Sequence, residues 1–180
     1  MRKDAPGPWA GFSLVELLAS MAVFAILLGL ALPKCHETVL RLRAASAMHQ
    51  LGSQLAQARN TAITTRVPVT LCPSRGDGRC LGEPDWSAGW LLYRDPGRQE
   101  QPRQPGDILR DIRQPVHGSI RVLASSGRLR VRYQPDGRSG GNNLTLRICA
   151  DESLRGEVVV NNIGRVRTHR MTANAPCPRH

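Results

Sequence analysis

The sequence predicts an α+β fold in which one long N-terminal helix packs on antiparallel β-sheets. Three observations support this fold class. An apolar run with a single charge extends from Phe12 to Leu32, apolar residues with helical spacing follow it, and from Val67 onward the apolar residues alternate. A helix followed by many short strands is the order expected of an α+β domain. A chain of 180 residues suits one hydrophobic core with a terminal extension.

The apolar run has about the ~20 residues that a helix needs to cross a membrane. A helix in a soluble core is rarely apolar on all sides. A secretory signal peptide would have a shorter apolar region before a small-residue cleavage site, which Gly29-Leu30-Ala31-Leu32-Pro33 matches poorly. We therefore expect an uncleaved, single-pass transmembrane helix.

The helix is expected to continue beyond Pro33 with one face against a core. Its apolar residues recur every three or four positions, at Leu40, Ala44, Ala47, Met48, Leu51, Leu55, Ala58 and Ala62. Pro33 lacks a backbone N–H, so it should bend the helix where the bilayer gives way to water. The helix should end near Thr64-Thr65, before Pro68.

Short strands are expected over the rest of the chain, where β-branched and aromatic residues alternate with polar ones. They cover Val67 to Cys72, Gly89 to Tyr93, Ile108 to Ile112, Ser119 to Leu123, Arg128 to Tyr133, Leu144 to Cys149 and Glu157 to Val160. Between Arg128 and Tyr133 every second residue should face the core. Arg128, Arg130 and Arg132 would then share the other face. A proline-rich loop is expected from Asp95 to Gly106.

The cysteines indicate an oxidising compartment. Four of the five lie well downstream of the apolar run, and of their three possible pairings we favour Cys72 with Cys80 and Cys149 with Cys177. Neither the Cys72–Cys80 spacing nor the histidines match a zinc site, so no metal is predicted. Cys35 is left over at the membrane surface, without an assigned role.

No enzymatic activity and no cofactor is predicted. The five histidines have no ligand spacing. Ser125-Ser126-Gly127 lacks the context of a nucleophile elbow, and no glycine motif that cradles phosphate is present.

The single acidic residue of the apolar run is Glu16. A charge inside a bilayer costs roughly 2.5 to 3.5 kcal/mol on insertion scales, so such a residue usually has a functional partner. The alternative is that Glu16, one turn into the run, lies at the level of the lipid headgroups.

The segment Gly11-Phe12-Ser13-Leu14-Val15-Glu16-Leu17, preceded by the basic Arg2 and Lys3, resembles the type IV prepilin signature. The resemblance implies that prepilin peptidase cuts between Gly11 and Phe12 and that the new amine of Phe12 is N-methylated. It also implies that Glu16 pairs with the first residue of a neighbouring subunit. A buried carboxylate recovers its desolvation cost only when it meets that ammonium in the correct register, so Glu16 would direct assembly.

The resemblance implies a division of the chain into four parts. They are a cleaved leader (1–11), a transmembrane and assembly helix (12–33), its amphipathic continuation (34–65) and a β-rich head (66–180). The helix would lie in a bacterial inner membrane with the head in the periplasm, until the subunit joins a pilus or pseudopilus made of other pilins or pseudopilins.

The remainder of the chain resembles the GspH/FimT branch of these proteins. The segments that carry this resemblance are Gln57-Ala58-Arg59-Asn60-Thr61-Ala62-Ile63, Val69-Thr70-Leu71-Cys72, Asp77-Gly78-Arg79-Cys80, Trp86-Ser87-Ala88-Gly89-Trp90-Leu91 and Gly164-Arg165-Val166-Arg167. The branch has two antiparallel sheets on the helix. GspH-like members are structural pseudopilins of type II secretion. FimT-like members are minor pilins of type IV pili, some of which bind DNA through a C-terminal Gly-Arg-x-Arg motif during natural transformation.

The tail favours the DNA-binding role. In an extended segment Arg165 and Arg167 point to one side, roughly 6.5 to 7 Å apart, which is close to the phosphate spacing along one DNA strand. Gly164 would let the backbone approach the ligand, and Arg170, His169 and Arg138 would extend the patch. Binding would be to double-stranded DNA, without base recognition.

The net positive charge of the chain is compatible with DNA binding but does not require it. The net charge is +11, and it falls to +10 when Arg2, Lys3 and Asp4 leave with the leader. Two alternatives remain open: arginine enrichment also follows from a GC-rich genome, and arginines on an edge strand protect against aggregation.

Overall fold

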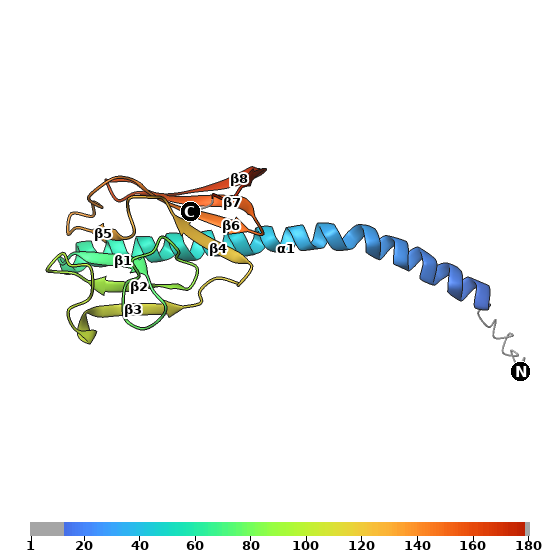
Figure 1. Cartoon of the computed structure of the whole chain (residues 1–180), viewed down its shortest axis with the longest axis horizontal. Coiled ribbons are helices and arrows are strands. Elements are labelled where there is room, and N and C mark those ends of the chain that lie inside the picture. Colours follow the sequence, from blue (N-terminus) through green and yellow to red (C-terminus); the bar gives the residue numbers. More distant parts are fainter. Residues whose placement is uncertain (1–12, 179–180) are drawn as a thin grey trace, which may run out of the picture. The chain divides into compact units, whose positions relative to one another are not determined.

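The computed structural model describes residues 13–178, and the chain divides after Thr38 into two compact units. A single helix, α1 (Leu14–Thr65), contributes to both units (Figure 1). It is long and apolar enough to cross a membrane, by length and composition. In the first unit its large apolar side chains are exposed along the chain from Leu14 to Leu32. The bend expected at Pro33 stays a prediction.

The second unit is built around the part of α1 that follows Thr38. Every apolar position expected on its core face is buried, with Met48 the most exposed of them at 5%. Because these residues recur every three or four positions, they form one continuous stripe along the helix. Leu51 and Leu55 lie at its centre, in the same cluster as Leu71, Val131 and Leu146 from the strands.

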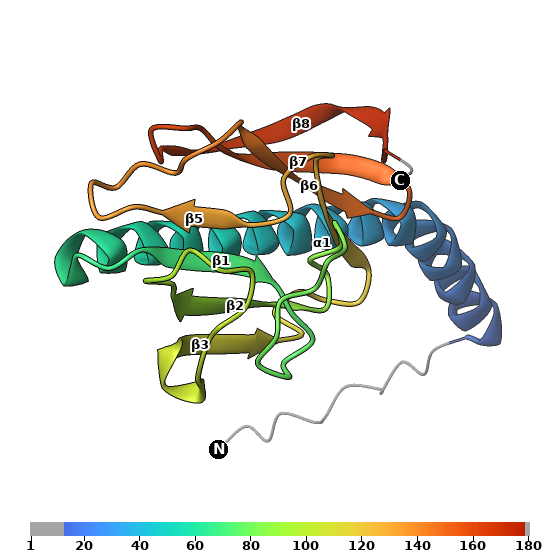
Figure 2. The ribbon, with the colours of Figure 1, turned by 60° about the vertical axis from the view of Figure 1, so that its left-hand side comes forward.

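Two antiparallel sheets cover this stripe (Figure 2). The first has the order β3-β2-β1-β5, and the second has the order β4-β6-β7-β8. The strands of the first sheet are β1 (Val69–Pro73), β2 (Gly89–Arg94), β3 (Ile108–Arg113), which follows a short 3-10 helix η1 (Pro105–Asp107), and β5 (Val131–Tyr133). Those of the second are β4 (Ile120–Ala124), β6 (Leu144–Ala150), β7 (Ser153–Val160) and β8 (Val166–Pro176). The α+β fold predicted from the sequence is confirmed.

Two strands differ from the sequence-based expectation by three residues or more at one end, and β8 was not among the expected strands. β5 begins at Val131, and ahead of it the Nε of Arg128 donates to the carbonyl of Arg130, 3.0 Å away. β7 begins at Ser153, earlier than expected. Trp86 and Trp90 are both core residues, at 0% and 1% exposure.

Two disulfides close the loops of the second unit. Cys72 is bonded to Cys80 with Cα atoms 5.5 Å apart, and Cys149 is bonded to Cys177 with Cα atoms 5.9 Å apart. These are the pairs that the sequence analysis favoured. The second bond joins the chain just beyond β8 to β6. Cys35 is free and exposed.

Candidate nucleic-acid interface

The Gly-Arg-x-Arg segment forms the tip of the β7–β8 hairpin. The N–H of Gly164 donates to the carbonyl of Asn161 at 2.9 Å, and the N–H of Asn161 donates to the carbonyl of Arg165 at 3.2 Å. Gly164 has a φ of +80°, so the connection is a three-residue hairpin loop that closes with a glycine bulge. The side chain of Asn161 accepts a further bond from the N–H of Arg165, 2.8 Å away. The turn therefore fixes where Arg165 leaves the loop.

Gly164 does not have the role expected from the sequence. It is buried, and a Cβ at this position would overlap the carbonyl oxygen of Gly137 and lie 3.2 Å from Cε1 of Tyr133. The missing side chain makes room for a neighbouring loop, so the expectation that it lets a ligand approach is corrected. Gly164 positions the arginines without being exposed to a ligand itself.

The neighbouring loop brings Arg138 to the hairpin. Ser139 donates from its N–H to the carbonyl of Asn162 at 3.0 Å and from its hydroxyl to the carbonyl of Asn161 at 2.9 Å. On the other side of the loop, Nε of Arg59 from α1 donates to the carbonyl of Gly137, 3.0 Å away. Arg138 lies between these anchored residues and is exposed.

The register of β8 separates its basic residues onto two faces. Val166 lies opposite Val160, Arg167 opposite Val159, and Arg170 opposite Gly156. Val160 is buried on the core side, so Arg167 lies on the outer face because side chains alternate along a strand.

His169, opposite Glu157, is also on the outer face. Arg165 lies in the turn, one residue before β8 begins. Arg170 is on the other face, where it lines a cavity of about 380 Å³ with Met48, His49 and Thr168. The prediction that Arg170 extends the patch is therefore wrong, because Arg170 and Arg167 lie on opposite faces of β8.

Arg165, Arg167 and Arg138 are all exposed. Within residues 13–178, no ion pair joins any of them to a carboxylate. Their positive charges are thus available to a ligand. Arg147, on the interior strand β6, is already paired with Glu157 of β7, with Nε and Oε1 3.4 Å apart.

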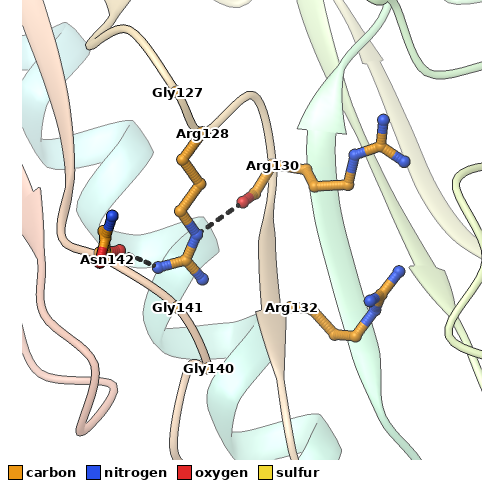
Figure 3. Close-up of a pocket in the computed structure, with 7 residues that line it drawn as sticks. All are labelled: Gly127, Arg128, Arg130, Arg132, Gly140, Gly141 and Asn142. Atoms are coloured by element: carbon orange, nitrogen blue, oxygen red, sulfur yellow. Dashed lines mark hydrogen bonds between the residues drawn. The ribbon is translucent and has the colours of Figure 1, made fainter.

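The three arginines that precede or belong to β5 do not share one face as expected (Figure 3). Arg128 turns toward the glycine-rich loop, where its Nη1 donates to the carbonyl of Asn142 at 2.6 Å. Arg130 and Arg132 point to the opposite side of the backbone (Figure 3). The cause is the loss of strand geometry before Val131, which ends the alternation of side chains.

Arg132 is held by a buried carboxylate. Its Nε lies 2.6 Å from Oδ2 of Asp95, whose side chain is only 2% exposed. Asp95 also accepts from the hydroxyl of Thr70 at 2.9 Å and from the N–H of Gln99 at 2.6 Å. Burial, with a further contribution from the negative charge of Asp95, raises the pKa of the nearby Tyr93 to about 12. The ion pair between Arg132 and Asp95 therefore stabilises the head. It also leaves Arg132 without a free charge for a ligand.

Three further expectations concern residues outside the hairpin. Gly11 and Phe12, the expected cleavage site, lie outside the described residues. Glu16 is in the first turn of α1 and is exposed in the single chain. Within the described part of the chain, no group of three or more His, Cys, Asp or Glu residues is arranged to hold a metal ion.

A long helix with an apolar N-terminal half and antiparallel sheets on its second half defines a type IV pilin-like subunit, either a minor pilin or a pseudopilin. The chain belongs to the GspH family: the family model described as "Type II transport protein GspH" matches residues 47–164. The prokaryotic N-terminal methylation motif matches residues 10–32. Proteins of this family and fold are structural subunits that do not act as enzymes.

Solved structures with a similar fold are those of the type IV minor pilin FimU of Pseudomonas aeruginosa, strain PAO1. One crystal form has a TM-score of 0.58 and 16% identity, and the alignment covers 77% of this chain and 97% of FimU. A second crystal form has a TM-score of 0.53 and 16% identity, covering 74% and 99%. No significant match is found among curated protein sequences. At this identity the likeness concerns the fold alone.

Proposed function

We propose that this minor pilin binds double-stranded DNA without sequence preference, through Arg165 and Arg167, and serves DNA uptake in natural transformation. The observation that carries the proposal is a set of exposed arginines at one end of the β7–β8 hairpin, with Arg138 beside them, which form no ion pair with a carboxylate of residues 13–178. Two arginines on one face of an extended strand lie roughly 6.5 to 7 Å apart. They are suited to two successive phosphates of one strand.

The chemistry of such contacts explains the absence of sequence preference. Guanidinium groups that bind phosphates release counterions and read no base edges. A single subunit with two or three contacts binds weakly, and useful affinity comes from several subunits displayed together. Arg167 and His169 on the outer face of β8 are exposed, so this face is open to a duplex.

Assembly is proposed to follow from the N-terminus. Prepilin peptidase removes residues 1–11, Phe12 is N-methylated, and Glu16 pairs with the amine of a neighbouring pilin. Residues 12–33 hold the subunit in the bacterial inner membrane before assembly. Residues 34–65 carry the head, residues 66–180, in the periplasm, an oxidising compartment that suits two disulfides.

Membership of the GspH family favours a second candidate function. As a GspH-like minor pseudopilin, the subunit would have a structural role in type II secretion. The arginines of β8 would then only protect an edge strand from pairing with another chain. This candidate predicts no specific loss of DNA binding when the tail arginines are replaced.

The test compares two double variants of the full chain in detergent micelles. One is Arg165→Gln/Arg167→Gln, and the matched control is Arg110→Gln/Arg113→Gln, which removes two exposed arginines from β3 in the other sheet. Binding of a fluorescent duplex is followed by anisotropy between about 50 and 200 mM salt, a range over which phosphate contacts weaken strongly.

The tail variant is expected to reduce the slope of log K against log salt by about 1.8, or 0.9 for each lost phosphate contact. The control should bind as the wild type does. Equal loss in both variants would show that bulk charge alone is responsible. Absence of salt-sensitive binding by the wild type would favour the pseudopilin.

A further inference from the structure

The apex of the β7–β8 hairpin, Asn162 and Ile163, carries an exposed apolar side chain. The hydrogen bond from the N–H of Gly164 to the carbonyl of Asn161 joins the fourth and first residues of a β-turn, so Asn162 and Ile163 are its central residues. Neither of them has a positive φ, which excludes a type II turn and fits type I. Ile163 is 51% exposed. An apolar side chain therefore stands where the hairpin reverses.

Ile163 departs from the residue preferences of such a turn. The outer positions follow them, with Asn161 first and Gly164 fourth. Turns are dominated by Gly, Pro, Asn, Asp and Ser, and a β-branched side chain is restricted in rotamer there. Among the described residues, Ile163 is in none of the apolar core clusters and does not pack against them. A residue that breaks a local rule without contributing to the core is expected at a functional position.

The apex is held firmly from behind. Ser139 is fully buried and donates to the carbonyls of both Asn161 and Asn162. The side chain of Asn161 accepts from the N–H of Arg165, and Gly164 is buried under the turn. Because both ends of the turn are fixed, Ile163 is preorganised for a ligand and little conformational freedom is lost on binding.

Unneutralised positive charge surrounds this apolar side chain. Arg165 follows Ile163 by two residues, and Arg138 precedes Ser139, which is bonded to the turn. Both arginines are exposed and form no ion pair with a carboxylate of residues 13–178. A mainly apolar protein partner would bury these charges unpaired, at a cost. Duplex DNA offers phosphates to the arginines and the faces of stacked bases to the isoleucine.

We propose that Ile163 is a wedge, which enters the minor groove of the duplex held by Arg165 and Arg167 and partly unstacks one base step. The proposal rests on the proposed function. Apolar wedges of this kind, Ile among them, act from the minor groove beside Arg or Asn side chains, and Asn162 adjoins Ile163. The duplex is then selected by how easily a base step opens, without hydrogen bonds that identify its bases. A neighbouring pilin that packs on Ile163 is the competing occupant.

Ile163→Asn is the informative variant, because asparagine suits a turn and removes the apolar side chain. Its matched control is Leu109→Asn, which removes an exposed apolar side chain from β3 in the other sheet. Ile163→Leu keeps an apolar wedge. All are prepared as the full chain in detergent, and their melting temperatures are compared first. Ile163→Ala replaces the asparagine variant if that variant does not fold.

Each protein is titrated with two fluorescent duplexes that differ only in one central mismatch, which lowers the cost of unstacking. We expect the wild type and Ile163→Leu to bind the mismatched duplex about three- to tenfold more tightly, the effect of burying the exposed half of an isoleucine. Ile163→Asn should lose this preference and keep the salt slope of the wild type, because its phosphate contacts remain. Leu109→Asn should behave as the wild type does.

Unstacking is measured directly with 2-aminopurine beside the central step of the paired duplex, since the fluorescence of this base rises when it loses its stacking partner. Saturating wild type should raise the signal, and saturating Ile163→Asn should not. If Ile163→Asn keeps both the mismatch preference and the fluorescence rise while Arg165→Gln/Arg167→Gln reduces the salt slope, the wedge is refuted and the proposed function stands.

Three further outcomes overturn the proposal. If the wild type shows no salt-sensitive binding to either duplex, the proposed function and the wedge both fail. If replacing thymine by uracil, which removes the methyl groups of the major groove, weakens binding by the wild type and not by Ile163→Asn, Ile163 contacts the major groove. If Ile163→Asn leaves duplex binding unchanged and lowers incorporation into pili, Ile163 contacts a neighbouring pilin.

Discussion

Replacement of Gly164 by alanine tests whether this glycine organises the hairpin. Its φ of +80° is a left-handed conformation that costs other residues roughly 1–2 kcal/mol. The added methyl group would also overlap the carbonyl oxygen of Gly137. The loop must then move and lose the two bonds from Ser139 to the turn, at about 1 kcal/mol each. The expected loss of unfolding free energy is therefore about 3–4 kcal/mol.

The measurement is thermal unfolding of the full chain in detergent, followed by circular dichroism. For a protein of this size each kcal/mol lowers Tm by about 2–4 °C, so a decrease of roughly 6–16 °C is expected. Gly140→Ala is the control, because a Cβ there meets no atom within 4 Å. The opposing result is that Gly164→Ala and Gly140→Ala have the same Tm while only Gly164→Ala binds DNA less tightly. Gly164 would then contact the ligand and would not organise the hairpin.

Three other perturbations test the head. Arg132→Gln should lower the free energy of unfolding of the head by about 3–5 kcal/mol, because Asp95 is left buried and charged. Urea unfolding measures this loss, and a midpoint equal to that of the wild type would contradict it. Tyr93 ionises near pH 10 in the unfolded chain and near 12 in the folded one. The stability that depends on neutral Tyr93 is therefore complete below pH 10 and is lost as pH rises to 12. The Tm of Tyr93→Phe should fall less than that of the wild type over that range. Replacing Cys149 and Cys177 by serine should lower the free energy of unfolding by about 2–4 kcal/mol; a urea midpoint equal to that of the wild-type protein would contradict this.

The fold could be predicted from the sequence because local patterns determine most of it. The core face of α1 follows from the spacing of residues such as Leu51 and Leu55, and each residue of that face is buried. The strands follow from alternation, which needs no knowledge of distant neighbours. The tail could likewise be identified as an edge strand that begins after a turn.

The details of the site depend on contacts between distant segments. Gly164 is constrained by Gly137, and Arg59 holds the same loop from α1; the motif around Arg59 gave no indication of that partner. Arg132 pairs with Asp95, 37 positions away, and alternation alone assigned it to a free basic face. A signal for the hairpin was present, since two asparagines and a glycine precede the tail strand.

The two ends of β8 respond differently to force. At its start, the turn, its bonds to the neighbouring loop at Ser139 and the ladder of hydrogen bonds to β7 hold Arg165 and Arg167 in place. Just beyond its end, the bond between Cys177 and Cys149 joins the chain to β6, an interior strand of the sheet. Tension applied at the arginines would peel the strand away residue by residue until it reached this covalent stop. Further extension would have to pull β6 out of the core. The core of the second unit would therefore resist a force that a bound polymer exerts on Arg165 and Arg167.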